Sequence, residues 1–417
     1  MHTTTSLRPR RRAITWPIAV LLLSACNLEV TNPGPVNATF LDDKAAFPAL
    51  VNGSGRDLAE ALNWVSYTGA AVARELHPAG STGSFGITPA QQRGKIVDDE
   101  TGTHWQLSQR ARWTSESAVT RIKTVLGTAY ASNAQYLQAL VWVGYSNRLL
   151  AENFCDGVID GGARQDYTVY ITRSEAAFTE AITVATSQNN TTLLNAAKGG
   201  RAAIRLLKKD LTGAAADAAG LANTFAYKMP YNAIDADQYN RIYWAIANAP
   251  YRAHTVWGTY YETYYTSTKD PRVAWGSDPK NPVGDAAVGN LGKVPWYFEL
   301  KFAAKNSPIN LSTGWEMRLI EAEAKLAGGD VAGAMTLLNG RRVVLNLAPW
   351  TAANATEAWT ALKRERGIEL WLEGRRLADF RRWKANGTPG VTDDMAGRDV
   401  CFATSRAEKE SNPNFTP

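Results

Sequence analysis

Apolar residues recur every three to four positions over long stretches of the chain, which is the periodicity of an amphipathic helix. Stretches with strand-like character are short and sparse. The pattern therefore predicts a mainly all-α fold. The predicted helices span Ala45–Val72, Trp105–Leu126, Asn133–Phe154, Ser174–Thr186, Thr192–Lys209, Gly213–Thr224, Trp315–Leu326, Val331–Val344 and Thr356–Lys384.

Two segments repeat one helix-turn-helix pattern. Ala203–Ala215 and Ala324–Ala334 align around a shared Asp-x-x-Gly-Ala turn. A helix, a tight turn with Asp and a second helix that opens on small residues are typical of a tetratricopeptide hairpin, because small residues let two helices approach closely. The sequence thus predicts a tetratricopeptide-like scaffold of about four stacked hairpins. The two weaker candidate hairpins pair Gln135–Phe154 with Ser174–Ala185, and Ala45–Val72 with Trp105–Leu126.

Two long stretches rich in Gly, Pro and Asn, Pro78–Gly102 and Tyr265–Pro308, separate the predicted helices. Loops of this length in a compact domain usually carry function. The predicted scaffold therefore has long irregular insertions, of which the aromatic-rich region at about 227–310 is the largest.

The first 25 residues have the order of an export signal. A basic segment, Arg8–Arg12, precedes an apolar segment, Ala13–Leu23, and small residues lead to Cys26. The apolar segment is too short to span a bilayer. We expect a bacterial lipoprotein: a signal peptide at 1–25, a lipidated Cys26 that begins a tether at 26–36, and one helical domain at 37–417.

Composition and charge narrow the classes of function. The 417 residues are 45% hydrophobic, enough for a sizeable core. The formal charge is +6, but four arginines lie in the signal, which leaves 41 basic against 39 acidic residues. Net charge therefore does not support a nucleic-acid partner. Four histidines are too few for a rich metal centre, and we predict no metal and no cofactor.

Cys155 and Cys401 are the two cysteines that remain after Cys26. Export to an oxidising compartment would allow them to pair. The apolar, helical context of Cys155 instead favours two separate buried thiols. We expect the unpaired state, with the disulfide as the alternative.

The segment Lys363–Lys384 holds eight basic and four acidic residues interleaved with apolar ones. On a continuous helix Glu373 would pair with Arg376. Asp379 would pair with both Arg375 and Arg382. Because acids alternate with bases, the pattern favours an amphipathic helix locked by ion pairs over a nucleic-acid arm or an anion site.

Four segments of the sequence form a recognisable set. They are the signal ending at Cys26, the phrase Ala151–Gly157, the late repeat Arg318–Arg342 and the run Glu365–Trp383. Together they resemble the SusD/RagB family of outer-membrane nutrient-binding lipoproteins. Gly367 departs from the family pattern, in which a larger residue is common. The resemblance implies a helical scaffold that lies on a TonB-dependent, SusC-like barrel, and captures a glycan, a peptide or another nutrient without chemistry.

Two other classes of function remain as alternatives. Asp98, Asp99 and Glu100 could supply the acid and base of a glycosidase, but neighbouring acids on a polar loop are more often solvated surface. The sequence contains no HExxH, CxxC, P-loop or GxSxG motif. The second alternative is a tetratricopeptide adaptor lipoprotein that assembles envelope proteins, which would not need the long aromatic region.

Aromatic residues concentrate where a glycan would be captured. Tyr227–Tyr265 contains nine of the 16 tyrosines. Sugar rings lay their C–H faces on aromatic rings, and their hydroxyls take polar partners. Helically spaced rings such as Tyr243 and Trp244 could equally pack a core. The expected ligand-binding aromatics are Trp105, Tyr260, Tyr264, Trp275 and Trp296, with Arg74 and Asp99 as polar partners.

Overall fold

The computed structural model describes residues 38–247, 251–393 and 395–416. The predicted signal peptide, Cys26 and the tether lie outside the described residues, so these assignments stay predictions. The unit described below is Thr39–Pro417. In its described residues, no helix is both long and apolar enough to cross a membrane.

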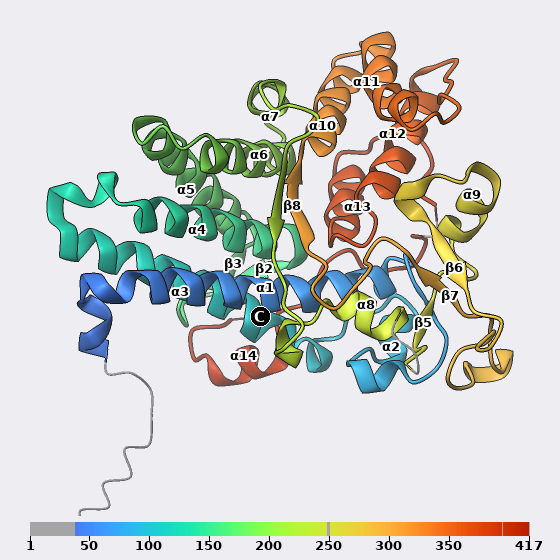
Figure 1. The fold of residues 1–417 in the computed structure, drawn as a ribbon, viewed down its shortest axis with the longest axis horizontal. Helices are drawn as coiled ribbons and strands as arrows, with labels where there is room; N and C mark the ends of the chain where they lie inside the picture. The colour runs from blue at the N-terminus through green and yellow to red at the C-terminus, as the bar shows by residue number, and fades with distance from the viewer. Residues whose placement is uncertain (1–37, 248–250, 394, 417) are drawn as a thin grey trace, which may run out of the picture. The chain divides into compact units, whose positions relative to one another are not determined.

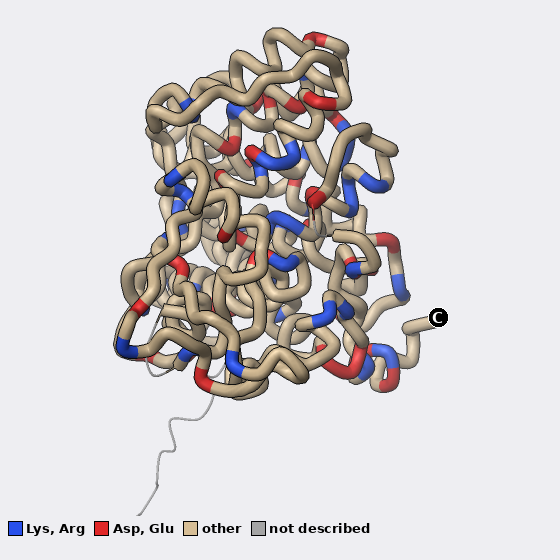
Figure 2. The backbone as a smooth tube through the Cα atoms, turned by 90° about the vertical axis from the view of Figure 1, so that its right-hand side faces the viewer, with Lys and Arg blue, Asp and Glu red and all other residues tan. Residues whose placement is uncertain are grey.

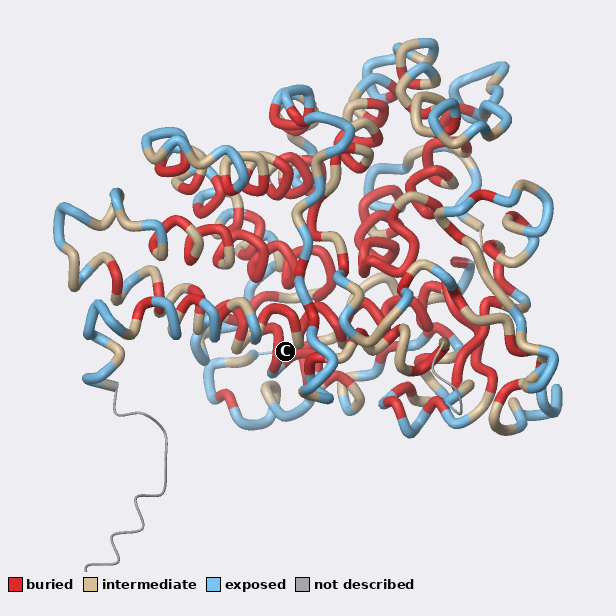
Figure 3. Tube along the Cα trace, in the orientation of Figure 1, coloured by how far each residue is buried: buried red, intermediate tan, exposed pale blue. Residues whose placement is uncertain are grey.

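Helices dominate this unit, as the periodicity predicts (Figure 1). Their buried faces are turned inward, and their outer faces are exposed (Figure 3). The longer helices are α1 (Phe47–Val72), α3 (Gly102–Leu126), α4 (Ala134–Asn153), α5 (Thr168–Ser187), α6 (Thr191–Lys208), α7 (Leu211–Ala219), α9 (Tyr260–Thr268), α10 (Gly314–Ala327), α11 (Val331–Val344), α12 (Ala355–Glu369) and α13 (Arg376–Ala385). The short ones are α2 (Pro89–Gln92), α8 (Arg241–Ile246) and α14 (Arg406–Ser411).

The long helices stack in sequence as hairpins. Helix α1 packs on α3, α3 on α4, α4 on α5, α5 on α6 and α6 on α7. Helix α7 then packs on α10, α10 on α11, and α12 on both α10 and α11. All four predicted hairpins are thus confirmed as neighbouring helices, and the mainly helical, tetratricopeptide-like fold class is confirmed.

The repeated Asp-x-x-Gly turn has the same geometry in both places. Asp210 accepts a hydrogen bond from Gly213 N at 2.9 Å, and Asp330 accepts one from Gly333 N at 2.8 Å. A Cβ atom at Gly213 would lie 2.1 Å from the Asp210 carboxylate, and one at Gly333 would lie 2.2 Å from that of Asp330. Each glycine is therefore required because the capping carboxylate occupies the space of a side chain.

Helices α4, α5 and α6 meet closely around one ring. A Cβ atom at Gly144 of α4 would lie 2.4 Å from the Phe178 ring of α5, and one at Gly200 of α6 would lie 2.2 Å from it. Phe178 is fully buried. The two glycines let a large ring fill the centre of three packed helices.

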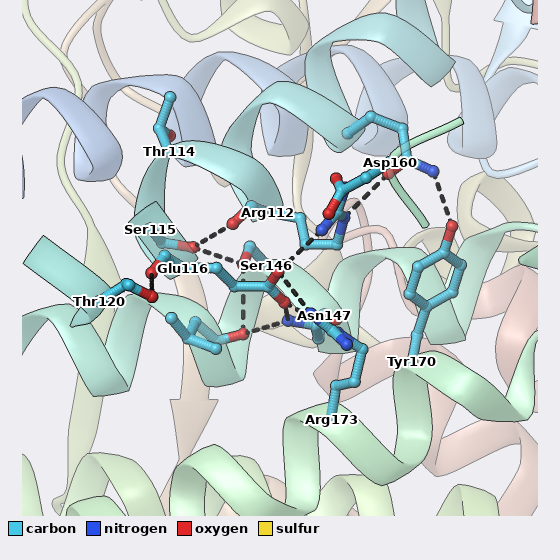
Figure 4. Close-up of polar contacts among 12 residues, drawn as sticks. Arg112, Thr114, Ser115, Glu116, Thr120, Ser146, Asn147, Asp160, Tyr170 and Arg173 are labelled. Carbon is cyan, nitrogen blue, oxygen red and sulfur yellow. Dashed lines mark hydrogen bonds and ion pairs between the residues drawn. The ribbon is translucent and has the colours of Figure 1, made fainter. Parts of the chain in front are cut away.

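Charged side chains also join α3, α4 and α5 (Figure 4). Glu116 accepts hydrogen bonds from Arg112 at 2.7 Å, Arg173 at 2.6 Å and Asn147 at 3.0 Å. Arg112, which is buried, also donates to Asp160 at 2.6 Å. With its carboxylate fully engaged, Glu116 ties three helices together and leaves no free oxygen for chemistry.

Among the residues that the structure describes, the strands form four antiparallel pairs. Pair β4 (Ala226–Met229) and β8 (Ile309–Thr313) brings together the two ends of the long insertion, so residues 230–308 leave and rejoin the helical stack at one place. Within the predicted loop at 265–308, two strands pair, so this stretch is more regular than expected. The other pairs are β1 (His77–Pro78) with β5 (His254–Thr255), β2 (Asp156–Gly157) with β3 (Gln165–Asp166), and β6 (Trp275–Ser277) with β7 (Tyr297–Glu299).

The prediction of one helix over Thr356–Lys384 is wrong. Helix α12 ends at Glu369 and α13 begins at Arg376. Leu372 and Gly374 have φ angles of 63° and 72°, a left-handed backbone that ends a helix. A Cβ atom at Gly374 would lie 2.7 Å from Ser66 Oγ of α1. The break carries Trp371 and Leu372 into the core, where both are fully buried.

The break also changes the ion pairs. Glu373 pairs with Lys301 at 2.8 Å and not with Arg376, and Arg375 pairs with Glu152 of α4 and not with Asp379. The predicted pair of Asp379 with Arg382 is present at 2.9 Å. The segment is locked by ion pairs, as predicted, but most of them reach distant parts of the chain.

The expectation of two unpaired cysteines is also wrong. Cys155 and Cys401 form a disulfide with their Cα atoms 5.2 Å apart. Helix α4 ends at Asn153, so Cys155 lies in an extended segment, where Cys155 N donates to Phe402 O at 2.9 Å. The segments around Phe154 and Phe402 pair in parallel, and this pairing brings the two sulfur atoms together.

Candidate functional site

Four partly exposed aromatic rings gather where β5, β6, β7 and α9 meet. We call this group, Trp257, Tyr265, Trp275 and Tyr297, the aromatic patch. Trp275 stacks on Tyr297 with ring centroids 4.3 Å apart and an interplanar angle of 13°. The Tyr265 ring meets Trp275 edge-on at 5.9 Å. These rings form a supported aromatic surface at the edge of the insertion.

Strand register explains why Trp275 and Tyr297 stack. Trp275 pairs with Glu299 and Ser277 pairs with Tyr297, so the two rings are diagonal neighbours on one face of β6 and β7. Gly276 between them admits the Phe298 ring on the opposite face, since a Cβ atom there would lie 2.7 Å from that ring. The alternation of the strands thus places Phe298 on the face opposite the stacked pair, where it is also partly exposed.

A single threonine joins Trp257 to this pair of strands. The Thr255 hydroxyl accepts hydrogen bonds from Tyr297 N at 2.8 Å and Trp257 N at 3.1 Å. Val256 N also donates to Tyr297 O at 2.8 Å. Trp257 packs edge-on against His77 of β1 with ring centroids 5.2 Å apart. The indole is therefore packed on β1, and the backbone of Trp257 shares the Thr255 hydroxyl with that of Tyr297.

Charged groups border the patch. Arg74 donates from Nη2 to Gly258 O at 3.1 Å, and Glu262 accepts from Gly258 N at 2.6 Å. Trp275 Nε1 donates to Glu262 O at 3.3 Å. Burial, followed by the nearby Arg74 charge, lowers the pKa of His77, so this buried imidazole is neutral at pH 7. The charges at the border include the Arg74 guanidinium and the Glu262 carboxylate, both of which can bond sugar hydroxyls. They also include Lys269, whose Nζ lies 5.2 Å from the centroid of the Tyr265 ring.

The structure brings together two of the seven predicted ligand residues. Trp275 belongs to the patch, and Arg74 lies at its border. Asp99 is exposed but pairs with Arg406 beside α14 at 2.7 Å. The Tyr260 ring is partly buried on α9, where it stacks on Tyr264 at 5.6 Å.

The other three predicted aromatics are inside the protein. Trp105 is 4% exposed and donates from Nε1 to Glu408 at 3.1 Å. Trp296 is 2% exposed and donates to Ile246 O at 2.9 Å. Tyr264 is 7% exposed and donates to Asp270 at 3.1 Å. Protein atoms cover these rings, so they serve packing in this conformation and do not offer a face to a ligand.

The residues predicted from the sequence did not include four members of this candidate site: Trp257, Tyr265, Tyr297 and Glu262. The density of aromatic residues between 227 and 310 located the region. It did not separate outward rings from inward ones, because that depends on how β6 pairs with β7. The signal that could have separated them is the alternation of side chains along a strand, first at Trp275 and again at Tyr297. Each strand has only three residues, which is too short for that alternation to stand out in the sequence.

Two of the three neighbouring acids of the glycosidase alternative, Asp98 and Asp99, pair with basic residues of α14. The three acids form a short 3-10 helix, Asp98–Glu100. Asp98 pairs with Lys409 at 3.0 Å, and the hydrogen bond from Lys409 lowers the pKa of Asp98. Glu100 accepts from Thr88 Oγ1 at 2.6 Å. An acid held ionised in this way is unsuited to protonate a leaving group.

Charged residues near the patch do not gather into a cluster of one sign. On the side of the unit that carries β6, β7 and α9, basic and acidic positions are interspersed (Figure 2). Among residues 38–247, 251–393 and 395–416, no three His, Cys, Asp or Glu side chains are grouped so as to hold a metal ion.

Comparisons with known proteins agree with this architecture. Residues 222–416 match the sequence model of the SusD family. This carboxyl-terminal part is similar to that family, and the resemblance to SusD/RagB proteins is confirmed. No curated protein matches the chain.

Solved structures extend the likeness to almost the whole chain. A SusD superfamily protein from Parabacteroides distasonis superposes with a TM-score of 0.67 at 13% identity, over 89% of this chain and 98% of the other. A SusD-like carbohydrate binding protein from Bacteroides vulgatus gives 0.65 at 15% identity, over 89% and 97%. A laminarin binding SusD-like protein gives 0.62 at 16% identity, over 90% and 98%. At such identities the likeness establishes a shared fold.

Proposed function

We propose that this protein captures a glycan on the aromatic patch and does not cleave it. The observation that carries the proposal is the stacked pair Trp275 and Tyr297, partly exposed beside Trp257 and bordered by Arg74 and Glu262. Flat apolar faces with hydrogen-bonding groups at their edge suit a sugar ring. Two proteins with the same fold are described as carbohydrate binding and laminarin binding, which supports the proposal.

The patch is well prepared for binding. Trp275 is held by its stacking partner, by Tyr265 at its edge and by the hydrogen bond from its indole nitrogen to Glu262 O. A ring that is already immobile loses little rotational freedom when a sugar packs on it. The binding energy is then not spent on ordering the site.

Substitution of Trp275 tests the proposal. Trp275→Ala should weaken glycan binding by about 1 to 3 kcal/mol, which is about 5- to 150-fold in Kd, because it removes the central ring. The assay is isothermal titration calorimetry with laminarin and a panel of other soluble polysaccharides. Trp113→Ala is the matched control, since Trp113 is 55% exposed and lies outside the patch. Equal affinity of wild type and Trp275→Ala for every bound glycan would refute the site.

Delivery to a membrane transporter completes the proposed function. By family resemblance, a lipid on Cys26 anchors the protein at the outer membrane, and a SusC-like, TonB-dependent barrel receives the glycan. The test is affinity capture of the detergent-solubilised native lipoprotein. Co-purification of a large outer-membrane barrel would support transport. Recovery of soluble or scaffold proteins alone would favour the adaptor alternative. Labelled glycan recovered intact after incubation would exclude the glycosidase.

A further inference from the structure

A pocket separate from the aromatic patch lies between the helical stack and the start of the insertion. It has a volume of about 430 Å³. Helices α1 and α4 form one side, and the segment that follows β4 forms the other; no residue of the aromatic patch lines it. We call it the Trp142 pocket. Its principal lining residues are Asn52, Arg56, Gln138, Trp142, Met229 and Asn232.

One half-buried indole provides the apolar face. Trp142 packs on Tyr227 with centroids 5.9 Å apart, and Tyr227 stacks on the buried Tyr145 at 5.7 Å. Gln138 donates to the Tyr227 hydroxyl at 3.1 Å. The ring therefore rests on a fixed stack of aromatic residues, and it does not need to be ordered by a ligand.

The edge of the same indole is available for hydrogen bonding. Trp142 Nε1 has no acceptor among the described residues. Gly55 of α1 faces this edge, and a Cβ atom there would lie 3.1 Å from Trp142 Nε1. The glycine keeps the approach to the N–H donor clear, which a larger residue would narrow.

Amide groups line the rim with free hydrogen-bonding capacity. The Asn232 side-chain oxygen accepts from Ile234 N at 3.0 Å and Asp235 N at 2.8 Å, so its amide nitrogen points away from these partners. That nitrogen donates to no residue that the structure describes. The exposed Asn52 amide has no hydrogen-bond partner in the described part of the chain. Both groups are placed to bond hydroxyls of a small polar ligand.

The pocket carries no net charge that would select an ion. Arg56 is the one charged residue that lines it in the described structure. Its guanidinium donates to Asp235 at 3.0 Å and lies 3.6 Å from Glu60, so its charge is balanced. An aromatic face, free amide groups and a neutral interior suit a polyhydroxyl ligand more than a carboxylate or a phosphate.

We propose that the Trp142 pocket binds one or two neutral sugar units, separately from the aromatic patch. Its volume lies in the range of about 300 to 1,000 Å³ that small-ligand pockets occupy, so it holds one or two sugar rings and not a long chain. A protein with both sites would hold a polysaccharide at the patch and a terminal unit or a released monosaccharide at this pocket.

The test uses the detergent-solubilised full chain and a panel of neutral monosaccharides and disaccharides: glucose, galactose, mannose, xylose, N-acetylglucosamine, maltose and cellobiose. Saturation-transfer NMR identifies the sugars that bind, and titration gives Kd. Trp142→Ala should weaken binding of at least one of them tenfold or more. Asn52→Ala should weaken the affinity for the same sugar about threefold. Because Asn52 is exposed and has no hydrogen-bond partner in the described part of the chain, this variant should fold even if Trp142→Ala does not.

Two controls separate this pocket from the patch. Trp275→Ala should leave the affinity for the small sugar unchanged, and Trp113→Ala should leave every affinity unchanged. The proposal is overturned if no sugar of the panel binds in a way that depends on Trp142 and Asn52, or if Trp275→Ala abolishes small-sugar binding. If only the proposal for the patch is wrong, Trp275→Ala will bind polysaccharide normally, and small-sugar binding will still depend on Trp142.

Discussion

Removal of the Cys155–Cys401 disulfide is the sharpest test of how this fold is held together. The bond closes a loop with a sequence separation of 246 residues and fixes the final segment against the end of α4. The variant Cys155→Ser/Cys401→Ser removes it with a change of one atom at each position. The neighbouring backbone hydrogen bonds, such as Cys155 N to Phe402 O, can remain.

The magnitude follows from the length of the loop. Cross-linking removes chain entropy from the unfolded state, and for a loop of this size the stabilisation is about 5 kcal/mol at 25 °C. Measured values for native disulfides are about 2 to 5 kcal/mol, so we expect the double variant to lose about 3 to 5 kcal/mol of unfolding free energy. With an unfolding entropy of about 2.1 cal/mol/K per residue, this lowers Tm by about 4 to 6 °C.

The assay is differential scanning calorimetry of wild type and variant under non-reducing conditions. Either single substitution, Cys155→Ser or Cys401→Ser, should lower Tm about as much as the double one, because each removes the same bond. Wild type in a reductant that opens the disulfide should match the double variant. A double variant whose Tm lies within about 1 °C of wild type would refute the loop-entropy reasoning.

Two further predictions concern buried positions. Burial raises the pKa of Glu299 to about 8, so between about pH 5 and pH 8 the folded state retains a proton that the unfolded state has lost. The unfolding free energy should therefore fall as the pH rises through this range. Glu299→Gln should flatten that fall in urea titrations, and an unchanged slope would contradict the prediction. Gly200→Ala should cost about 1 to 3 kcal/mol, because its Cβ would lie 2.2 Å from the Phe178 ring. Its control, Gly53→Ala, meets no atom within 4 Å and should be neutral or slightly stabilising by the same measurement, so an equal loss in both variants would exclude overpacking as the cause.

Features that depend on near neighbours could be predicted from the sequence. The Asp-x-x-Gly turns are examples, since the carboxylate of Asp210 or Asp330 bonds a backbone N–H only three residues away. Helix α11 was predicted with its observed bounds, Val331–Val344, because its capping Asp and its apolar spacing are both local.

The break between α12 and α13 could not be predicted in the same way. Leu370, Trp371 and Leu372 continue the helical spacing and are compatible with a helix. What interrupts it is the approach of Gly374 to Ser66 of α1, with Trp371 and Leu372 entering the core. A contact between residues some 300 positions apart overrides local preference here.

The candidate site was predictable as a region but not as a set of residues. Aromatic density marked the insertion, and two of the seven predicted residues, Trp275 and Arg74, lie together at the patch. Trp296 is separated from Tyr297 by one peptide bond, yet the first ring is buried and the second is partly exposed. Trp296 precedes β7 and donates to Ile246 O, whereas Tyr297 begins β7 and stacks on Trp275. Contacts with residues far along the chain therefore decide which ring is covered.

The sequence by itself determined the helical class, the repeated hairpins and the location of the aromatic insertion, because periodicity, capping and composition act over a few residues. Only the tertiary structure decided which cysteines pair, where the charged segment breaks and which rings remain accessible. Those outcomes depend on contacts between residues that are far apart in the chain, and their energies arise only when the whole unit has packed.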